Sequence, residues 1–255
     1  MSKIISIANQ KGGVGKTTTA VNLSACFASL GYKVLLIDMD PQGNAGRGLG
    51  IDITSMKTTI FDVLTGSMHI DQVIMPTRYQ NLHLLPSNLK LATLDGYFAD
   101  RNFSTSFTLL KEKIENISLS YDFIIIDCPP SLGFLSLNSL AASTSVIIPI
   151  QCEYFAMEGV ASVLSTINKV HHQFNQKLRI EGFLLTMYDS KVSLNVEVAE
   201  EVRNVFKENT FSVAIPRNVS LAEACALGQP ITTYKPTSHG ATAYMSLAKE
   251  VLERG

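Results

Sequence analysis

Short apolar runs alternate along the chain with longer stretches in which apolar residues recur at helical spacing. Two runs, Val34-Leu35-Leu36-Ile37 and Phe123-Ile124-Ile125-Ile126, are apolar throughout. This is typical of parallel strands that are covered on both faces. The pattern predicts strands at 3–8, 33–38, 82–86, 122–127, 145–150, 180–187 and 211–215. It predicts helices at 16–30, 106–118, 155–172, 195–208 and 240–254.

The alternation of strands and helices predicts an α/β fold, in which helices flank a doubly wound, mostly parallel sheet. Ligands of such sheets bind beyond the carboxyl ends of the strands. We therefore expect the chemistry to follow Ala8, Asp38, Asp127 and Met187. The chain contains no internal repeat, low-complexity stretch or linker, so residues 1–255 are predicted to form a single domain.

Composition narrows the choice of function. Hydrophobic residues make up 46% of the 255 residues and charged residues 17%, which fits a globular chain with a large core. The formal net charge is −1, so binding to nucleic acid would need a local basic patch. No apolar run is long enough to span a membrane, and the start of the chain does not resemble a signal peptide. The four cysteines are widely spaced and contain no C-x-x-C, which favours a reducing cytoplasm.

A glycine-rich loop follows the first predicted strand and precedes a helix. It reads KGGVGKT over residues 11–17. Glycines let successive N–H groups point inward, and together with the helix N-terminus they form a cradle for phosphate. We expect Lys16 to contact the phosphates and the Thr17 hydroxyl to bind Mg²⁺. The usual P-loop pattern does not fit, because its first glycine would fall on Gln10. The predicted nucleotide-binding residues of the loop are Lys11, Gly12, Gly13, Val14, Gly15, Lys16, Thr17 and Thr18.

The loop resembles the deviant Walker A box of the ParA/MinD ATPases, a branch of the P-loop NTPases. The resemblance continues through LLIDMDPQGNA, FIIIDCPPS, PIQCEYFAMEG and IPRNVSLAEA, in the expected order over nearly the whole chain. It is closest to the ParA/Soj partitioning proteins. The resemblance implies an Mg²⁺-dependent ATPase with ATP and Mg²⁺ as cofactors.

Three aspartates stand at predicted strand ends: Asp38, Asp40 and Asp127. Phosphoryl transfer needs carboxylates that hold Mg²⁺ and a group that orients water. Asp127 is interpreted as the Walker B carboxylate that holds the metal. By resemblance, Asp40 polarises the attacking water and Asp38 supports the metal shell.

The resemblance also assigns a role to Lys11. In the family this lysine crosses a dimer interface and contacts the nucleotide phosphates of the partner, as an arginine finger does in trans. Hydrolysis then depends on dimerisation, and Lys11, Lys16 and Asp40 form the predicted catalytic set. By the same resemblance, Pro216 and Asn218 contact the adenine, with Met187 and Arg217 nearby.

The family binds DNA non-specifically as an ATP dimer. Two candidate residues, Arg203 and Lys207, are four apart and are predicted to share one helical face. Residues 177–217 carry as many acidic as basic residues, and where relatives read PRNVR this chain has Ser220. The candidate DNA-binding residues are Lys191, Arg203, Lys207, Arg217 and Lys235.

The predicted function is therefore an ATP-dependent, dimerising switch that partitions a chromosome or plasmid. Its expected partners are a second copy of the chain, non-specific DNA and a ParB-like stimulating protein, in the cytoplasm on the nucleoid and without membrane insertion. An alternative is a MinD-like positioning ATPase that docks on a membrane through a C-terminal amphipathic tip. Two further alternatives are an ATP-driven ligase or reductase component on the same fold, and a binding module that holds ATP without hydrolysing it.

Overall fold

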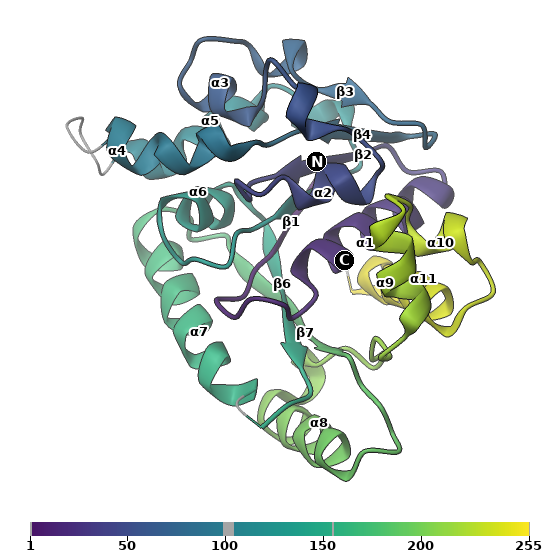
Figure 1. The fold of residues 1–255 in the computed structure, drawn as a ribbon. Helices are drawn as coiled ribbons and strands as arrows, with labels where there is room; N and C mark the ends of the chain where they lie inside the picture. Colours follow the sequence, from purple (N-terminus) through teal and green to yellow (C-terminus); the bar gives the residue numbers. More distant parts are fainter. Residues whose placement is uncertain (1, 99–104, 155, 255) are drawn as a thin grey trace.

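One sheet runs through the part of the chain that the computed structural model describes, which is residues 2–98, 105–154 and 156–254 (Figure 1). Its strand order is β3-β4-β2-β5-β1-β6-β7. All neighbouring strands are parallel except β3 and β4, which are antiparallel. The strands are β1 Lys3–Ile7, β2 Val34–Asp38, β3 Met75–Pro76, β4 Leu82–Leu85, β5 Phe123–Asp127, β6 Ser145–Gln151 and β7 Arg179–Thr186.

Helices cover both faces of the sheet, as predicted (Figure 1). One face carries α1 Lys16–Ser29, α2 Asn44–Gly48, α9 Val219–Ala226, α10 Ile231–Tyr234 and α11 His239–Glu253. The other carries α3 Ile60–Leu64, α4 Leu94–Phe98, α5 Leu109–Glu115, α6 Phe134–Ala142, α7 Ala156–Gln173 and α8 Ser193–Phe206. Short 3₁₀ turns lie at Ile53–Ser55, Ile70–Gln72, Leu89–Thr93, Thr105–Thr108, Ser118–Ser120 and Lys207–Asn209. No helix in these described ranges is long and apolar enough to cross a bilayer.

The central strands bury both of their faces. In β2, Leu35 and Ile37 pack into the core beneath α5 to α7, whereas Val34 and Leu36 pack beneath α1 and α11. All four side chains are fully buried. The uninterrupted apolar runs therefore belong to strands that are covered on both faces, as the sequence pattern predicted.

The predicted strand at 211–215 is wrong. The amides of Phe211 and Ile215 do donate to carbonyls of β7, at 3.0 and 2.8 Å. Between them, however, the amides of Ser212 and Val213 donate to the carboxylate of Glu250 on α11. A side chain from a distant helix thus takes the donors that would have extended the sheet.

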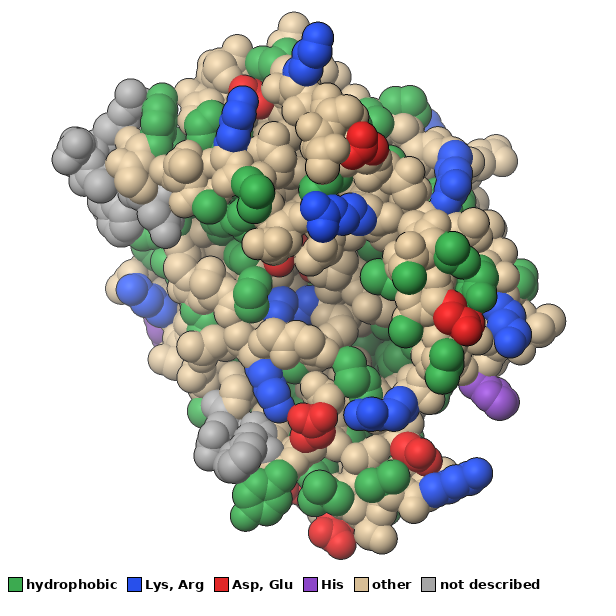
Figure 2. Space-filling model, viewed as in Figure 1, with side chains coloured by type: hydrophobic (Ala, Val, Ile, Leu, Met, Phe, Trp, Pro, Cys, Tyr) green, Lys and Arg blue, Asp and Glu red, His purple; other side chains and the backbone are tan. Residues whose placement is uncertain are grey.

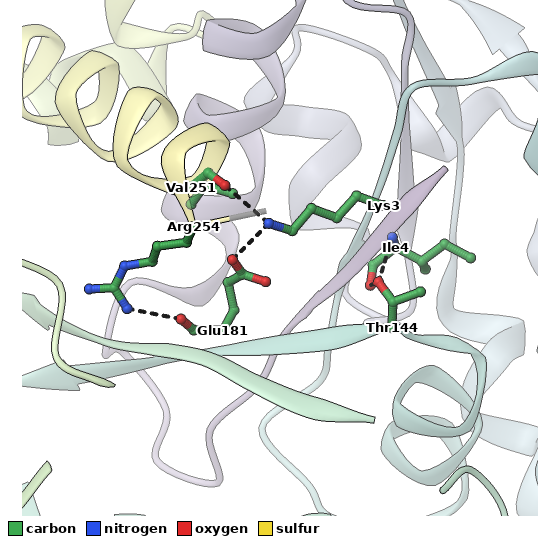
Figure 3. A network of polar contacts seen from close by, with 6 residues as sticks. All are labelled: Lys3, Ile4, Thr144, Glu181, Val251 and Arg254. Atoms are coloured by element: carbon green, nitrogen blue, oxygen red, sulfur yellow. Dashed lines mark hydrogen bonds and ion pairs between the residues drawn. The ribbon is translucent and has the colours of Figure 1, made fainter. Parts of the chain in front are cut away.

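The amino end of β1 is joined to β7 by a buried ion pair and to the last helix by a hydrogen bond (Figure 3). The Lys3 ammonium lies 2.8 Å from Glu181 Oε1 on β7 and 3.0 Å from the carbonyl oxygen of Val251 on α11. The Glu181 side chain is only 2% exposed, and its Oε2 has no hydrogen-bond partner among the described residues. Arg254 donates to the backbone carbonyl of Glu181 at 3.1 Å. These contacts hold α11 at the amino end of β1, which is the end opposite the phosphate loop.

Candidate active site

The phosphate loop lies at the carboxyl end of β1, in the middle of the sheet. Gly13 and Gly15 have φ of 77° and 89°, a left-handed conformation that favours glycine. Asn9 fastens the start of the loop, because its Nδ2 donates to the carbonyl of Pro149 at 2.6 Å and its Oδ1 accepts the amide of Lys11 at 3.0 Å. The loop is therefore held in shape by β6, the neighbouring strand.

Helix α1 begins directly after the loop, at Lys16. Its N-cap residue is Gly15, so no side chain caps the first turn. Uncapped N–H groups at a helix N-terminus form an anion site. The Lys16 side chain is largely buried beside them and its Nζ donates to the carbonyl of Lys11 at 3.0 Å. Burial lowers the pKa of the Lys16 ammonium, and the charge of Asp127 opposes that effect. The uncapped start of α1 and the Lys16 ammonium thus lie together at the end of the loop, an arrangement that could hold an anion.

Asp38 and Asp127 lie side by side at the ends of β2 and β5, where their backbones are paired in register. Both are fully buried. Asp38 Oδ1 accepts the amide of Asp40 at 3.0 Å, and its Oδ2 accepts the amides of Ala45 and Gly46 at 3.0 and 3.3 Å. Burial raises the pKa of Asp38, and these backbone donors partly offset the rise. Asp38 therefore fixes the course of the loop that follows β2.

Asp127 differs from Asp38 in its hydrogen bonding. Both of its carboxylate oxygens are buried and lack a hydrogen-bond partner among the described residues. Burial raises the pKa of Asp127 well above its usual value, and the charge of Asp38 adds to the rise. The nearby Thr17 hydroxyl favours the charged form, but its geometry falls short of a hydrogen bond. Two free, buried carboxylate oxygens next to a hydroxyl fit a hard cation such as Mg²⁺.

The rest of the Mg²⁺ shell has to come from elsewhere. No group of three or more His, Cys, Asp or Glu side chains in the described ranges could hold a metal ion by itself. Mg²⁺ is commonly held by one or two carboxylates, water and the phosphates of a nucleotide. The residues present fit that arrangement.

Asp40 stands at the start of the loop after β2 and is 7% exposed. Its Oδ1 accepts the amide of Gln42 at 2.9 Å, and its backbone carbonyl accepts the Ser87 hydroxyl at 2.7 Å. Its Oδ2 accepts no hydrogen bond within the described part of the chain. One oxygen of an oriented carboxylate is thus available for another donor, such as water.

A cavity of about 240 Å³ opens beside the phosphate loop. It is lined by the four residues predicted for the base pocket, Met187, Pro216, Arg217 and Asn218, together with Gly15 and Thr18 of the loop. Asn218 caps α9 by accepting the amide of Ser220 at 2.9 Å. The remaining wall residues are Thr186, Ile215, Leu221, Ala222 and Tyr244. The sequence analysis did not single them out, because Ile215, Leu221 and Ala222 lie in a motif that was used only for the family resemblance, and Thr186 and Tyr244 lie in no motif.

Comparison with known proteins identifies a family and relatives that this chain resembles. A family model described as an AAA domain matches residues 2–180. The sporulation initiation inhibitor protein Soj of Bacillus subtilis (strain 168) is 47% identical over 255 residues, which is 100% of both chains. The chromosome partitioning protein ParA of Myxococcus xanthus (strain DK1622) is 44% identical over 254 residues, covering 100% of this chain and 89% of the relative.

The chain belongs to the ParA/Soj family of partitioning ATPases.

A solved structure adds ligands to the comparison. The cobyrinic acid a,c-diamide synthase of Mycobacterium smegmatis, crystallised with ADP and magnesium, matches with a TM-score of 0.87 and 34% identity over 99% of this chain and 95% of that one. It shows that a homologous P-loop fold binds a nucleotide together with Mg²⁺.

In this ParA/Soj-family chain, Lys11 lies at the rim of the site. Its Nζ is 3.3 Å from Glu153 Oε2, which belongs to the segment between β6 and α7. The two side chains are 37% and 45% exposed. Sequence reasoning missed Glu153, which lies in a motif that was used only for family resemblance.

Two other loops of this ParA/Soj-family chain meet beside the site. The turn after α2 contains Gly50 and the turn after α9 contains Gly228, which has φ of 63°. A Cβ on Gly228 would lie 2.6 Å from Gly50 Cα, so only glycine fits there. Arg78 donates to the carbonyl of Gly228 at 2.6 Å. The turn after α2 is thereby packed against the turn after α9, the helix that contributes Leu221 and Ala222 to the cavity wall.

The candidate DNA-binding residues are all exposed, and none forms an ion pair within the described ranges. The predicted shared helical face of Arg203 and Lys207 is wrong, however. Helix α8 ends at Phe206, and Lys207 takes φ of 48°, which turns the chain off the helix. On the face of the molecule that Figure 2 shows, Lys and Arg are interspersed with Asp and Glu. They surround a hollow whose floor contains charges of both signs. The basic residues do not form one continuous patch in this view.

Proposed function

We propose that residues 1–255 form a single ATPase domain that works as a nucleotide-dependent switch in the cytoplasm. Two ATP-bound copies would pair, bind non-specific DNA of the nucleoid and partition a chromosome or plasmid, until a ParB-like partner stimulates hydrolysis. The convergence of the phosphate loop with Asp40 and Asp127 at one edge of the sheet carries the proposal.

The phosphate loop would bind the triphosphate through backbone N–H groups and Lys16. Lys16 donates to the carbonyl of Lys11, so an incoming phosphate would take over that ammonium without a large movement. Thr17 and Asp127 would hold Mg²⁺, which neutralises charge on the phosphate oxygens when it is bound. Asp38 supports Asp127 and keeps the next loop in place.

Asp40 would orient the attacking water. Its Oδ1 is held by the amide of Gln42, which fixes the plane of the carboxylate and leaves Oδ2 to accept a hydrogen bond from water. Water then attacks the γ-phosphorus and the bond to the bridging oxygen of ADP breaks. Lys11 from the partner copy would stabilise the charge that develops on the phosphates, so that turnover requires the dimer.

The base would occupy the cavity lined by Met187, Pro216, Arg217 and Asn218. Helix α9, which contributes to its wall, is followed by a turn that packs against the turn after α2 through Gly228 and Gly50. A base seated in the cavity would lie next to Gly15 and Thr18 of the phosphate loop.

The packing of α11 makes this helix unavailable as the membrane-docking tip of the alternative. Leu247, Ala248 and Val251 are fully buried, and Arg254 at the end of the helix is held by Glu181 and Glu250. An amphipathic tip would instead have to present its apolar side chains to lipid.

A co-sedimentation assay tests the proposal. The Asp40→Ala variant should bind ATP without hydrolysing it, dimerise and pellet with non-specific DNA, whereas with ADP it should not. Binding should fall as salt rises, with a slope of about −0.9 for each phosphate contacted in log–log form. Asp71→Ala, an exposed aspartate far from the loop, should hydrolyse ATP like the unmodified chain and serves as the control. If the ATP dimer forms but does not bind DNA, the ATPase part of the proposal stands and the DNA-binding part is refuted.

A further inference from the structure

The side chain of Lys11 is engaged within its own protomer. Its ammonium lies 3.3 Å from Glu153 Oε2, while Gln151 donates from Nε2 to Oε1 of the same carboxylate. Both oxygens of Glu153 are thus in contact with a donor, which fixes the carboxylate towards Lys11. The backbone of Lys11 is held as well, through Asn9 and through Lys16.

The segment that carries Glu153 is itself well anchored. The carbonyl of Cys152 accepts the side-chain amide of Asn195 on α8 at 2.6 Å, and the amide of Cys152 donates to Thr186 on β7 at 3.2 Å. Helix α7 passes close to the loop, since a Cβ on Gly159 would lie 3.8 Å from Lys11 Cβ. The backbone that carries Glu153 is therefore held in place beside the loop.

We infer that Glu153 is a positioning residue that holds Lys11 on its own protomer and must release it before Lys11 can reach the phosphates of a partner copy. The inference rests on the proposed function, because only a second copy gives Lys11 another anion to contact. The Glu153 carboxylate and the partner's triphosphate then compete for one ammonium.

The size of the effect follows from exposure. The Lys11–Glu153 pair is partly exposed, and such a pair changes an equilibrium constant by about 1.4- to 5-fold. A symmetric dimer releases two of these pairs. Replacing Glu153 by glutamine should therefore strengthen ATP-dependent dimerisation by about 2- to 30-fold. The difference should shrink at high salt, since partly exposed pairs are screened.

The experiment uses the full chain with the Asp40→Ala substitution, which stops turnover. The dimerisation constant is measured by sedimentation velocity with ATP, at low and at high salt, for Glu153→Gln and for the control Glu200→Gln. Glu200 is an exposed residue of α8 that forms no ion pair in the described part of the chain, so its substitution changes the net charge equally. The expected result is a tighter dimer for Glu153→Gln alone, with the difference lost at high salt.

Other outcomes overturn the inference in distinguishable ways. Equal dimerisation constants for Glu153→Gln and the parent show that Glu153 does not hold Lys11 back. A weaker dimer shows that Glu153 instead presents Lys11 to the partner. An equal gain in Glu200→Gln shows a general effect of net charge. If none of the proteins dimerises with ATP, the proposed function fails, and the role of Glu153 fails with it.

Discussion

Replacing Asp127 by asparagine should make the nucleotide-free protein more stable while it removes the response to Mg²⁺. Both carboxylate oxygens of Asp127 are buried without a hydrogen bond, next to the like charge of Asp38. A buried polar group without a partner costs about 1–3 kcal/mol, and a charged one costs more. The asparagine side chain still buries an amide, so we expect a gain of about 1–3 kcal/mol. For a chain of this length that raises the melting temperature by about 2–12 °C.

The response to ligand should change in the opposite direction. A ligand at 100 times its dissociation constant stabilises a protein by about 2.7 kcal/mol, which is about 5–11 °C here. The unmodified chain should show such a shift with ATP and Mg²⁺, and the shift should shrink when EDTA removes the metal. In the Asp127→Asn variant, ATP should give the same small shift with and without Mg²⁺.

The pH dependence gives an independent check on the same residue. The pKa of Asp127 is raised in the folded state, mainly by burial. Its contribution to stability is therefore fully present below the unfolded pKa of about 3.9 and is lost as pH rises through the higher folded pKa. The nucleotide-free chain should lose stability over that range, and Asp127→Asn should lose less. Thermal unfolding followed by circular dichroism measures all of these quantities. An apo protein destabilised by Asp127→Asn that keeps its Mg²⁺-dependent shift would refute the reasoning.

Three further predictions concern other parts of the molecule. Lys16→Gln should abolish ATP binding measured by calorimetry, whereas Lys11→Gln should still bind ATP but lose turnover by about 10³-fold or more, because its action is in trans. Lys3→Met should cost about 3–5 kcal/mol in urea unfolding, since it leaves Glu181 buried and unpaired, and the double variant with Glu181→Leu should recover most of that loss. Gly228→Ala should weaken ATP binding and lower the melting temperature, because its Cβ would overlap the facing turn. Unchanged ATP affinity would show that the packing of this turn on the turn after α2 does not affect the base pocket.

The phosphate loop and the aspartates could be placed from the sequence because each follows a buried strand directly. The strand fixes where its carboxyl end lies, and Asp38 and Asp127 then meet through the register of β2 and β5. The position of a strand end is a local property, so a single sequence is enough to predict it.

Features that depend on distant partners could not be placed in this way. Residues 211–215 have the composition of a strand, but Glu250 takes two of their amide groups. Helix α6 was not predicted, because all nine of its residues are buried and it has no exposed polar face. The pairing of Lys11 with Glu153 joins positions 142 residues apart, which no local pattern reveals.

The buried ion pair at the amino end of β1 has a consequence for folding of the protein. Strand β1 precedes the other strands along the sequence, yet its neighbour β5 begins 120 residues later, and the two partners of Lys3 follow 178 and 248 residues after it. Covering both faces of this central apolar strand and the charge of Lys3 thus requires nearly the whole of the described chain. Contacts of such long separation slow folding and leave apolar segments exposed meanwhile. The central strand is therefore completed only by contacts far along the chain, and we expect the unfolded chain to bind chaperones that shield unpaired strands.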